Sequence, residues 1–154
     1  MRAVHIRQLG PGDAAAYQAL RLHGLRESPE AFGSTYEEDR ALALDEVAQR
    51  LTATGGVAAR VVFGAFDGDD LVGVAGCARQ GKTKARHKAI VWGMYVRPEQ
   101  RGRGVGRRLL EAIILEARTW PEVECLTLAV VERAAAARKL YRSMGFDVAR
   151  VVTH

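Results

Sequence analysis

The chain has 154 residues, of which 48% are hydrophobic and 27% are charged, with a formal net charge of +5 at pH 7. This length suits one domain with one core, and the hydrophobic fraction excludes an intrinsically disordered chain. The longest apolar stretch, residues 89–96, is far shorter than the roughly 20 residues of a membrane span, and the N-terminus lacks an apolar signal core. We therefore expect a single cytoplasmic domain over residues 1–154, with no membrane partner.

The first half of the chain predicts a strand, two helices and two further strands. Residues 3–8 alternate between apolar and polar side chains, as a half-buried strand does. A turn signal predicts the start of a helix at residue 11, which continues to about residue 26. Over residues 44–51, apolar side chains recur at the i, i+3, i+4, i+7 spacing of an amphipathic helix. Residues 60–66 and 71–80 are apolar strands, and the glycine- and aspartate-rich sequence between them predicts a hairpin turn.

The second half of the chain alternates strands with helices. It predicts a strand over 89–96, a helix over 105–117, a strand over 123–130, a helix over 134–143 and a strand over 146–152. Pro98 cannot continue a ladder and ends the first of these strands, and Gly145 supplies a left-handed helix cap. Because helices alternate with strands, we expect an α/β fold with a central mixed sheet of about six strands and four flanking helices.

Charge is distributed unevenly along the sequence. Residues 79–88 and 97–108 are two basic clusters, whereas residues 27–39 contain five carboxylates and no Lys or Arg. This distribution suggests one surface suited to an anion and another suited to a cation.

The cysteines and histidines give no sign of a metal site. Cys77 and Cys125 lie far apart, and neither has a histidine at ligand spacing, so we expect two buried thiols and no metal. The four histidines are scattered, and no serine-histidine-aspartate or HExxH pattern is present.

The glycine-rich segment 101–106 follows the strand 89–96 and opens the next helix. The first turn of a helix offers backbone N–H groups and a positive dipole end to an anion, and glycines let the backbone approach phosphate closely. Arg101, Arg103 and Arg107 add donors that match phosphate geometry. The P-loop pattern GxxxxGK[ST] and the dinucleotide pattern GxGxxG do not fit. The segment predicts a site for another phosphate-bearing ligand, with a solvated basic turn as the alternative.

The spacing Arg101-x-x-Gly104-x-Gly106 resembles the acetyl-CoA pyrophosphate loop of the GNAT superfamily of N-acetyltransferases. Residues 94–100 resemble the family's fourth strand and its exit, residues 140–146 its last helix, and residues 28–33 its substrate-side loop. The resemblance covers nearly the whole chain. It implies an enzyme that moves the acetyl group of acetyl-CoA to a primary amine by direct attack in a ternary complex. It also implies a mostly antiparallel sheet that splays between its fourth and fifth strands.

The resemblance implies that the pantetheine arm of acetyl-CoA pairs with the backbone of Met94 and Val96. The Met94 N–H would then stabilise the oxyanion, and Gly93 favours a local irregularity in the strand. The implied cofactor-binding residues are Met94, Tyr95, Val96, Arg101, Gly102, Arg103, Gly104, Val105, Gly106, Arg107, Ala137 and Tyr141.

Tyr141 is the implied general acid for the leaving thiolate, since a phenol can donate a proton to a thiolate. The alternative is a core tyrosine on the apolar face of its helix. Many members of the family carry an asparagine seven residues before this tyrosine, where this chain has Ala134.

The general base is unassigned. Some members of the family carry a glutamate on the fourth strand, where this chain has Ala89. Glu27, Glu30, Glu132 or a water chain could serve, or the amine could arrive neutral.

The acidic segment 27–39 lies where the family covers its acceptor, so a cationic amine would be attracted there. Glu27, Glu30, Phe32 and Tyr36 are the substrate candidates, and a solvated acidic face is the alternative. The acceptor could be a small amine, a polyamine or a protein amine.

Two rival functions remain open. A catalytically idle acetyl-CoA sensor would explain the missing asparagine and strand glutamate, although Tyr141 is retained. A nucleic-acid binder would need exposed, interleaved aromatics, and Trp92 and Tyr95 instead lie within an apolar strand.

The sequence also predicts a homodimer. Related proteins continue past the sixth strand into a seventh, whereas this sequence stops at His154. An unpaired sheet edge invites pairing with another chain.

Overall fold

The computed structural model describes residues 3–27, 29, 35–55, 59–79, 88–121, 123–130, 139, 142 and 148–150. Within these residues six strands form one sheet. They are β1 (His5–Gln8), β2 (Arg60–Asp67), β3 (Asp70–Arg79), β4 (Lys88–Val96), β5 (Cys125–Val130) and β6 (Val148–Arg150). The helices are α1 (Ala14–Glu27), α2 (Tyr36–Arg40), α3 (Leu44–Leu51) and α4 (Val105–Ala117), with the short 3-10 helices η1 (Pro11–Asp13) and η5 (Pro98–Gln100).

The order of the strands in the sheet follows their order in the chain, from β1 to β6. The pairings from β1 to β4 are antiparallel, and β4–β5 and β5–β6 are parallel. The expected α/β fold with a mixed, mostly antiparallel sheet is therefore confirmed.

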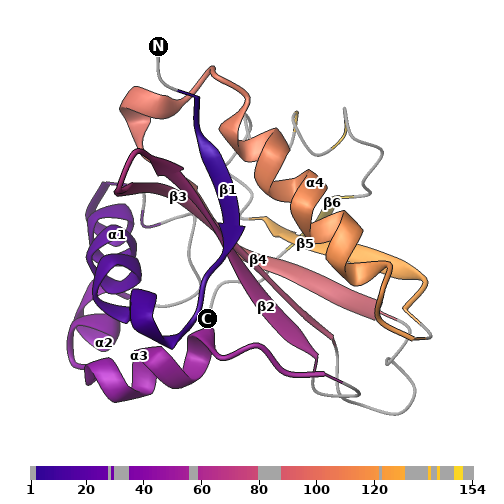
Figure 1. Cartoon of the computed structure of the whole chain (residues 1–154), viewed down its shortest axis with the longest axis horizontal. Coiled ribbons are helices and arrows are strands. Elements are labelled where there is room, and N and C mark those ends of the chain that lie inside the picture. The colour runs from indigo at the N-terminus through magenta and orange to yellow at the C-terminus, as the bar shows by residue number, and fades with distance from the viewer. Residues whose placement is uncertain are drawn as a thin grey trace.

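Helices cover both faces of this sheet (Figure 1). The helices α1, α2 and α3 lie together on one side, and α4 crosses the other. Because successive strand residues point to opposite faces, Val61 packs into the α4-side core and Val62 into the α1-side core. Leu109 and Ile113 of α4 are fully buried on one side, as is Leu20 of α1 on the other. The sequence pattern thus produces a three-layer molecule with two cores.

Most of the predicted elements lie where the sequence put them. The β2–β3 hairpin turns at Gly68, whose φ of 63° is easily adopted only by glycine. The predicted helix 134–143 and most of the predicted strand 146–152 lie outside the described residues.

Three local expectations were wrong. The sequence analysis missed α2, a five-residue helix whose first turn is capped by the Thr35 hydroxyl, which accepts from the Glu38 N–H. Leu44, assigned to the apolar face of α3, is 53% exposed because it stands at the first position of that helix. Cys125 is exposed rather than buried because it is the first residue of β5. Cys77 is buried as expected.

The strand β4 changes character halfway along its length. Its first half pairs with β5 from Lys88↔Cys125 to Val91↔Leu128, where the parallel register ends. The antiparallel register with β3 shifts between Val74 and Gly76, so two β4 residues oppose one residue of β3. β5 continues to pair with β6 through Val130. β4 and β5 therefore part beyond Val91, which is the splay that the family resemblance implied.

In the described part of the chain, no helix is both long enough and apolar enough to span a bilayer. Across the same residues, no three His, Cys, Asp or Glu side chains are grouped so that they could hold a metal ion.

Candidate functional site

A bulge marks the point where β4 leaves β5. Gly93 has a φ of 61°, in the left-handed region where side chains are strained. Beyond it the side chains alternate again: Met94 and Val96 pack against the α4-side core, and Tyr95 is buried in the α1-side core. The irregularity expected at Gly93 is present, and it sits next to the residue predicted to stabilise an oxyanion.

A buried ion pair lies directly behind the bulge. Arg21 of α1 bonds through Nε to the carboxylate of Asp39 in α2, and both residues are almost completely buried. A Cβ added to Gly93 would lie 3.3 Å from Arg21 Nη1, so the guanidinium reaches the bulge itself. Gln18 Nε2 donates to the Asp39 carbonyl oxygen over 2.5 Å. These contacts tie α1 and α2 to the bulged half of β4.

The surroundings of Arg21 keep its guanidinium charged. Burial opposes a positive charge on Arg21, but the neighbouring Tyr17 and Asp39 outweigh it and raise the pKa of the guanidinium. Burial in turn raises the pKa of Tyr17, so that residue stays a neutral phenol. Arg21 is therefore a permanent cation under the bulge, matched by one carboxylate.

A second cluster joins the C-terminal half of α1 to the end of β4. The Tyr95 hydroxyl lies 3.0 Å from His23 Nδ1. Arg101 forms an ion pair with Glu27 (Nη2 to Oε1, 2.9 Å), and its Cζ lies 5.6 Å from the centre of the Tyr95 ring. Arg101 Nε also donates to the Val96 carbonyl oxygen over 2.9 Å. The sequence analysis placed Glu27 and Arg101 in separate sites, and the fold brings them together.

The glycine-rich loop between β4 and α4 is open to a ligand. Gly102 and Gly104 have φ values of 81° and 76°, and a Cβ at either position would meet no atom within 4 Å. Gly104 is the N-cap residue of α4 and provides no capping side chain. The first backbone N–H groups of a helix have no partner within the helix. The loop thus offers unobstructed backbone to an anion.

Close packing fixes the start of α4. Val105 is buried at 2% exposure, and a Cβ on Gly73 of β3 would lie 3.3 Å from its Cγ1. Gly73 therefore lets α4 approach the sheet closely, which holds the helix N-terminus beside the end of β4. Gly106, next in the helix, is half-buried.

The arginines of the loop make different contacts. A relay of hydrogen bonds orients Arg103: its Nη1 donates to Gln100 Oε1, and Gln100 Nε2 donates to Asp67 Oδ2 over 3.2 Å. Arg107 is exposed on the first turn of α4. Arg108 points back to donate to the Val4 carbonyl oxygen. Arg101 is engaged with Glu27 of α1.

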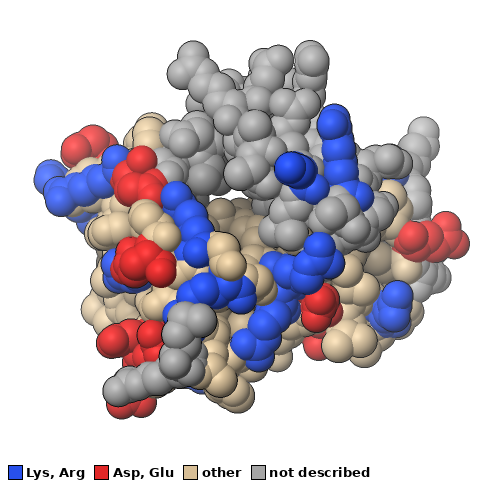
Figure 2. Space-filling model, turned by 90° about the horizontal axis from the view of Figure 1, so that it is seen from above, with Lys and Arg blue, Asp and Glu red and all other residues tan. Residues whose placement is uncertain are grey.

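The space-filling view shows how charge is arranged at this end of the molecule (Figure 2). Lys and Arg side chains run across the middle of the face, and most of the visible acidic side chains lie toward the side of α1, α2 and α3. Lys and Arg side chains are also visible among the acidic ones on that side.

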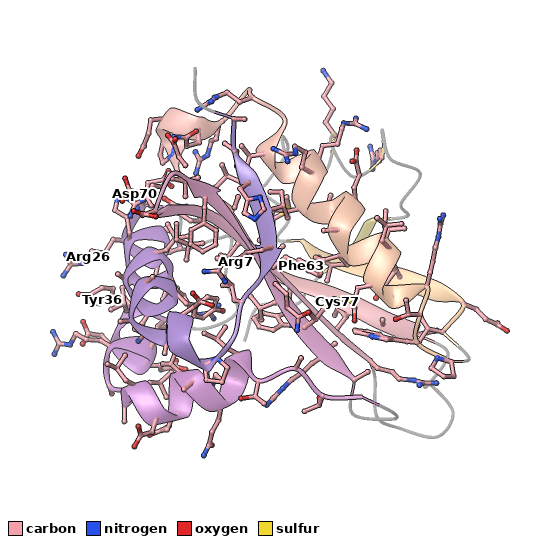
Figure 3. The ribbon with its side chains drawn as sticks, viewed as in Figure 1. Arg7, Arg26, Tyr36, Phe63, Asp70 and Cys77 are labelled. Carbon is pink, nitrogen blue, oxygen red and sulfur yellow. The ribbon has the colours of Figure 1, made fainter. Side chains whose placement is uncertain are left out.

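Part of the acidic segment is occupied by internal contacts. The Tyr36 hydroxyl accepts from Arg26 Nη2 over 2.5 Å, and the guanidinium stacks 4.3 Å from the Tyr36 ring centre (Figure 3). Glu37 pairs with Arg40 on the exposed surface of α2. Tyr36 thus bridges α1 and α2, which border the undescribed segment 30–34.

Several predicted site residues lie outside the described residues. They are Glu30, Phe32, Glu132, Ala137 and Tyr141. His23, Asp39 and Gln100 were missed. The sequence signal for His23 was its place on α1 four residues before Glu27, and no local signal pointed to Asp39 or Gln100.

The described geometry fits a phosphate-bearing ligand with an extended arm. The open glycines and the N-terminus of α4 suit the phosphates, and the parting of β4 from β5 leaves strand backbone beside them.

Comparison with known proteins points in the same direction. The sequence profile of the acetyltransferase (GNAT) family matches residues 22–146. No protein of curated function shows a significant sequence match.

Solved structures share the fold over most of their length. A GNAT-family acetyltransferase from Streptococcus pneumoniae superposes with a TM-score of 0.78 at 23% identity, covering 93% of this chain and 83% of its own. The acetyltransferase yncA from Salmonella typhimurium, solved with acetyl-CoA, gives 0.76 at 23%, covering 93% and 79%. The ribosomal-protein-alanine N-acetyltransferase from Brucella melitensis gives 0.74 at 25%, covering 93% and 84%.

Proposed function

Since the chain belongs to the acetyltransferase (GNAT) family, whose acyl donor is acetyl-CoA, we propose that it transfers the acetyl group of acetyl-CoA to a primary amine in a ternary complex. The observation that carries the proposal is the bulged end of β4, which parts from β5 beside the open glycine loop of α4.

The donor would be held from two sides. The backbone of residues 102–107 and the oriented Arg103 would bind the pyrophosphate, where the α4 dipole adds to the attraction. The backbone of Met94 and Val96 would pair with the pantetheine arm. Arg101 contributes indirectly, because it fixes the loop to Glu27 and to the Val96 carbonyl oxygen.

Bound acetyl-CoA supplies the thioester whose acetyl group is transferred. The Met94 N–H would donate to the oxygen on which negative charge develops, and the bulge at Gly93 supports this role by turning the backbone out of regular pairing. Tyr141 would hold the proton that the departing sulfur takes. Water is excluded from the α1 side of β4 by the buried Tyr95 and Arg21.

The acceptor is a small amine, a polyamine or a protein amine. The carboxylates of segment 27–39, among them Glu27 and Glu38, would attract a cationic group. The Brucella melitensis neighbour is named for a ribosomal-protein alanine, which makes a peptide N-terminus one reasonable acceptor to test.

A turnover screen tests the proposal. Thiol release from acetyl-CoA is measured with spermidine, an aminoglycoside and a peptide that begins with alanine. We expect at least one amine to be acetylated. We expect Tyr141→Phe to lower kcat about 100-fold with little change in the Kd of acetyl-CoA, as loss of a general acid does. Binding without turnover of any amine would instead identify an idle acetyl-CoA sensor, in keeping with Ala89 at the strand position where some members of the family carry a glutamate.

We also propose that the protein forms a homodimer. Among the described strands, β6 lies at one edge of the sheet, and an edge strand can pair with a second copy. Light scattering at micromolar concentration should give twice the chain mass, and a monomer with full activity would contradict this assembly.

A further inference from the structure

Acetyl transfer to an amine requires a proton acceptor. An alkyl ammonium group has a pKa of about 10 and carries no free electron pair at neutral pH. The family's strand glutamate is replaced here by Ala89, which is fully buried. Glu27 is held by Arg101 in a 2.9 Å ion pair that also anchors the loop. Glu27 is therefore already engaged at the end of β4.

His23 is a titratable side chain of α1 that contacts β4 beside the bulge. Its ring lies on the surface of α1, yet Nδ1 is 3.0 Å from the hydroxyl of Tyr95, the residue after Met94. The two rings are 6.2 Å apart and tilted by 53°. Nδ1 of the imidazole is thus fixed against the sheet, and Nε2 is the nitrogen that does not face the Tyr95 hydroxyl.

Tyr95 is suited to hold the imidazole and not to accept the proton itself. Burial, followed by the negative charge of Glu27, raises the pKa of the Tyr95 phenol. The hydroxyl therefore remains neutral over the working pH range. Its ring is 3% exposed and is packed in the α1-side core, so its oxygen is a rigid reference point.

Charges of both signs surround this pair. Glu27 on α1 and Glu99 on η5 face the Tyr95 hydroxyl, and Arg97 and Arg101 at the end of β4 oppose them. The carboxylates favour the approach of a cationic amine.

We propose that His23 accepts the proton of the substrate amine, with its ring held by the Tyr95 hydroxyl; this inference rests on the acetyltransferase function proposed above. In the active tautomer, Nδ1–H donates to the Tyr95 oxygen, and Nε2 carries the lone pair that takes a proton from the ammonium group.

The protons balance over the reaction. The first proton of the ammonium group goes to His23 Nε2 and from there to water. The freed nitrogen pair forms the bond to the acetyl carbon, and the carbon–sulfur bond breaks. The second proton leaves the new amide nitrogen and replaces, through solvent, the one that the sulfur takes from Tyr141. The net products are an acetylated amine, a thiol and one proton.

The test is the pH profile of kcat/KM for the amine, measured at saturating acetyl-CoA from pH 5.5 to 9.5. The probe is whichever of the three screened amines the wild type acetylates fastest. We expect His23→Gln to lose about 100-fold at pH 7 and to lose the pH-dependent rise of the wild type. The deficit should shrink toward pH 9.5, where more of the amine is neutral in solution. Added imidazole should restore part of the rate.

Three further measurements separate the outcomes. The Kd of acetyl-CoA for His23→Gln should stay within twofold, and His5→Gln, an exposed histidine on β1, should match the wild type. Tyr95→Phe should lower kcat/KM about tenfold and keep the pH-dependent rise. A His23→Gln profile like the wild type, or an equal loss at every pH, would overturn the proposal. Absence of turnover by the wild type with every amine would instead refute the acetyltransferase function.

Discussion

The two halves of β4 differ although they belong to one strand. From Lys88 to Val91 the strand pairs with β3 on one side and β5 on the other, and Ala89 and Val91 are fully buried. From Gly93 to Val96 it is bulged and has parted from β5.

The difference has a local cause and a distant support. The local cause is Gly93, whose left-handed backbone inserts the extra residue. The distant support comes from α1 and α2, which place the Arg21–Asp39 pair behind the bulge and His23 against Tyr95. One half of the strand thus serves the core, and the other is the half to which the proposed function assigns the acetyl donor.

The largest expected effect follows from removing the carboxylate behind the bulged half. Asp39→Ala removes the carboxylate that pairs with the buried Arg21, so the free energy of unfolding should fall by about 3–5 kcal/mol in a urea titration. Glu37→Ala removes a carboxylate of the same helix from an exposed pair and should cost less than about 1 kcal/mol. Equal losses in the two variants would mean that the buried pair does not support the bulge.

A matched pair of substitutions should separate the two halves. Val91→Ala removes two buried methyl groups and should cost about 2 kcal/mol of unfolding free energy, with kcat unchanged in the folded protein. Gly93→Ala places a side chain at a φ of 61° and should cost about 1–2 kcal/mol. Only Gly93→Ala should also lower kcat, by about tenfold. A kcat loss in Val91→Ala instead would reverse the assignment of the two halves.

The open loop that follows the bulged half should control donor affinity. Gly104→Val puts a β-branched side chain at a φ of 76° and over the backbone that would bind phosphate. Calorimetry should show the Kd of acetyl-CoA rising tenfold or more, which is about 1.4 kcal/mol or more. Gly55→Val, at another glycine with open space around it, is the control and should leave the Kd unchanged. An unchanged Kd in folded Gly104→Val would remove the loop from the donor site.

The smallest expected effect is a difference in reactivity between the two thiols, one of which lies beside the first half of β4, Lys88 to Val91. Cys77 is the β3 partner of Val91, and burial raises the pKa of its thiol to about 12. At pH 8 only about one such thiol in ten thousand would be a thiolate. An aromatic disulfide reagent should therefore label the exposed Cys125 quickly and Cys77 only on unfolding. Fast labelling of both thiols would show that the pairing of β3 with the first half of β4 opens readily.

Local signals were enough to predict much of this protein. Alternating apolar residues predicted the strands, Gly68 predicted the hairpin, and the glycines around Gly104 predicted the turn that opens α4, because each depends on backbone preferences within a few residues. The irregularity at Gly93 was also expected from the sequence.

Tertiary structure decided which side chains meet. The partner of Arg21 lies 18 residues away in a short helix that no periodic pattern announced, and the partner of His23 lies 72 residues away on β4. Glu27, a candidate for the substrate side, is paired with Arg101 of the donor loop because α1 packs across the end of β4. Periodicity and turn chemistry determine where elements begin and end, but a contact between distant side chains depends on how whole helices pack on the sheet, and no local stretch of sequence encodes that.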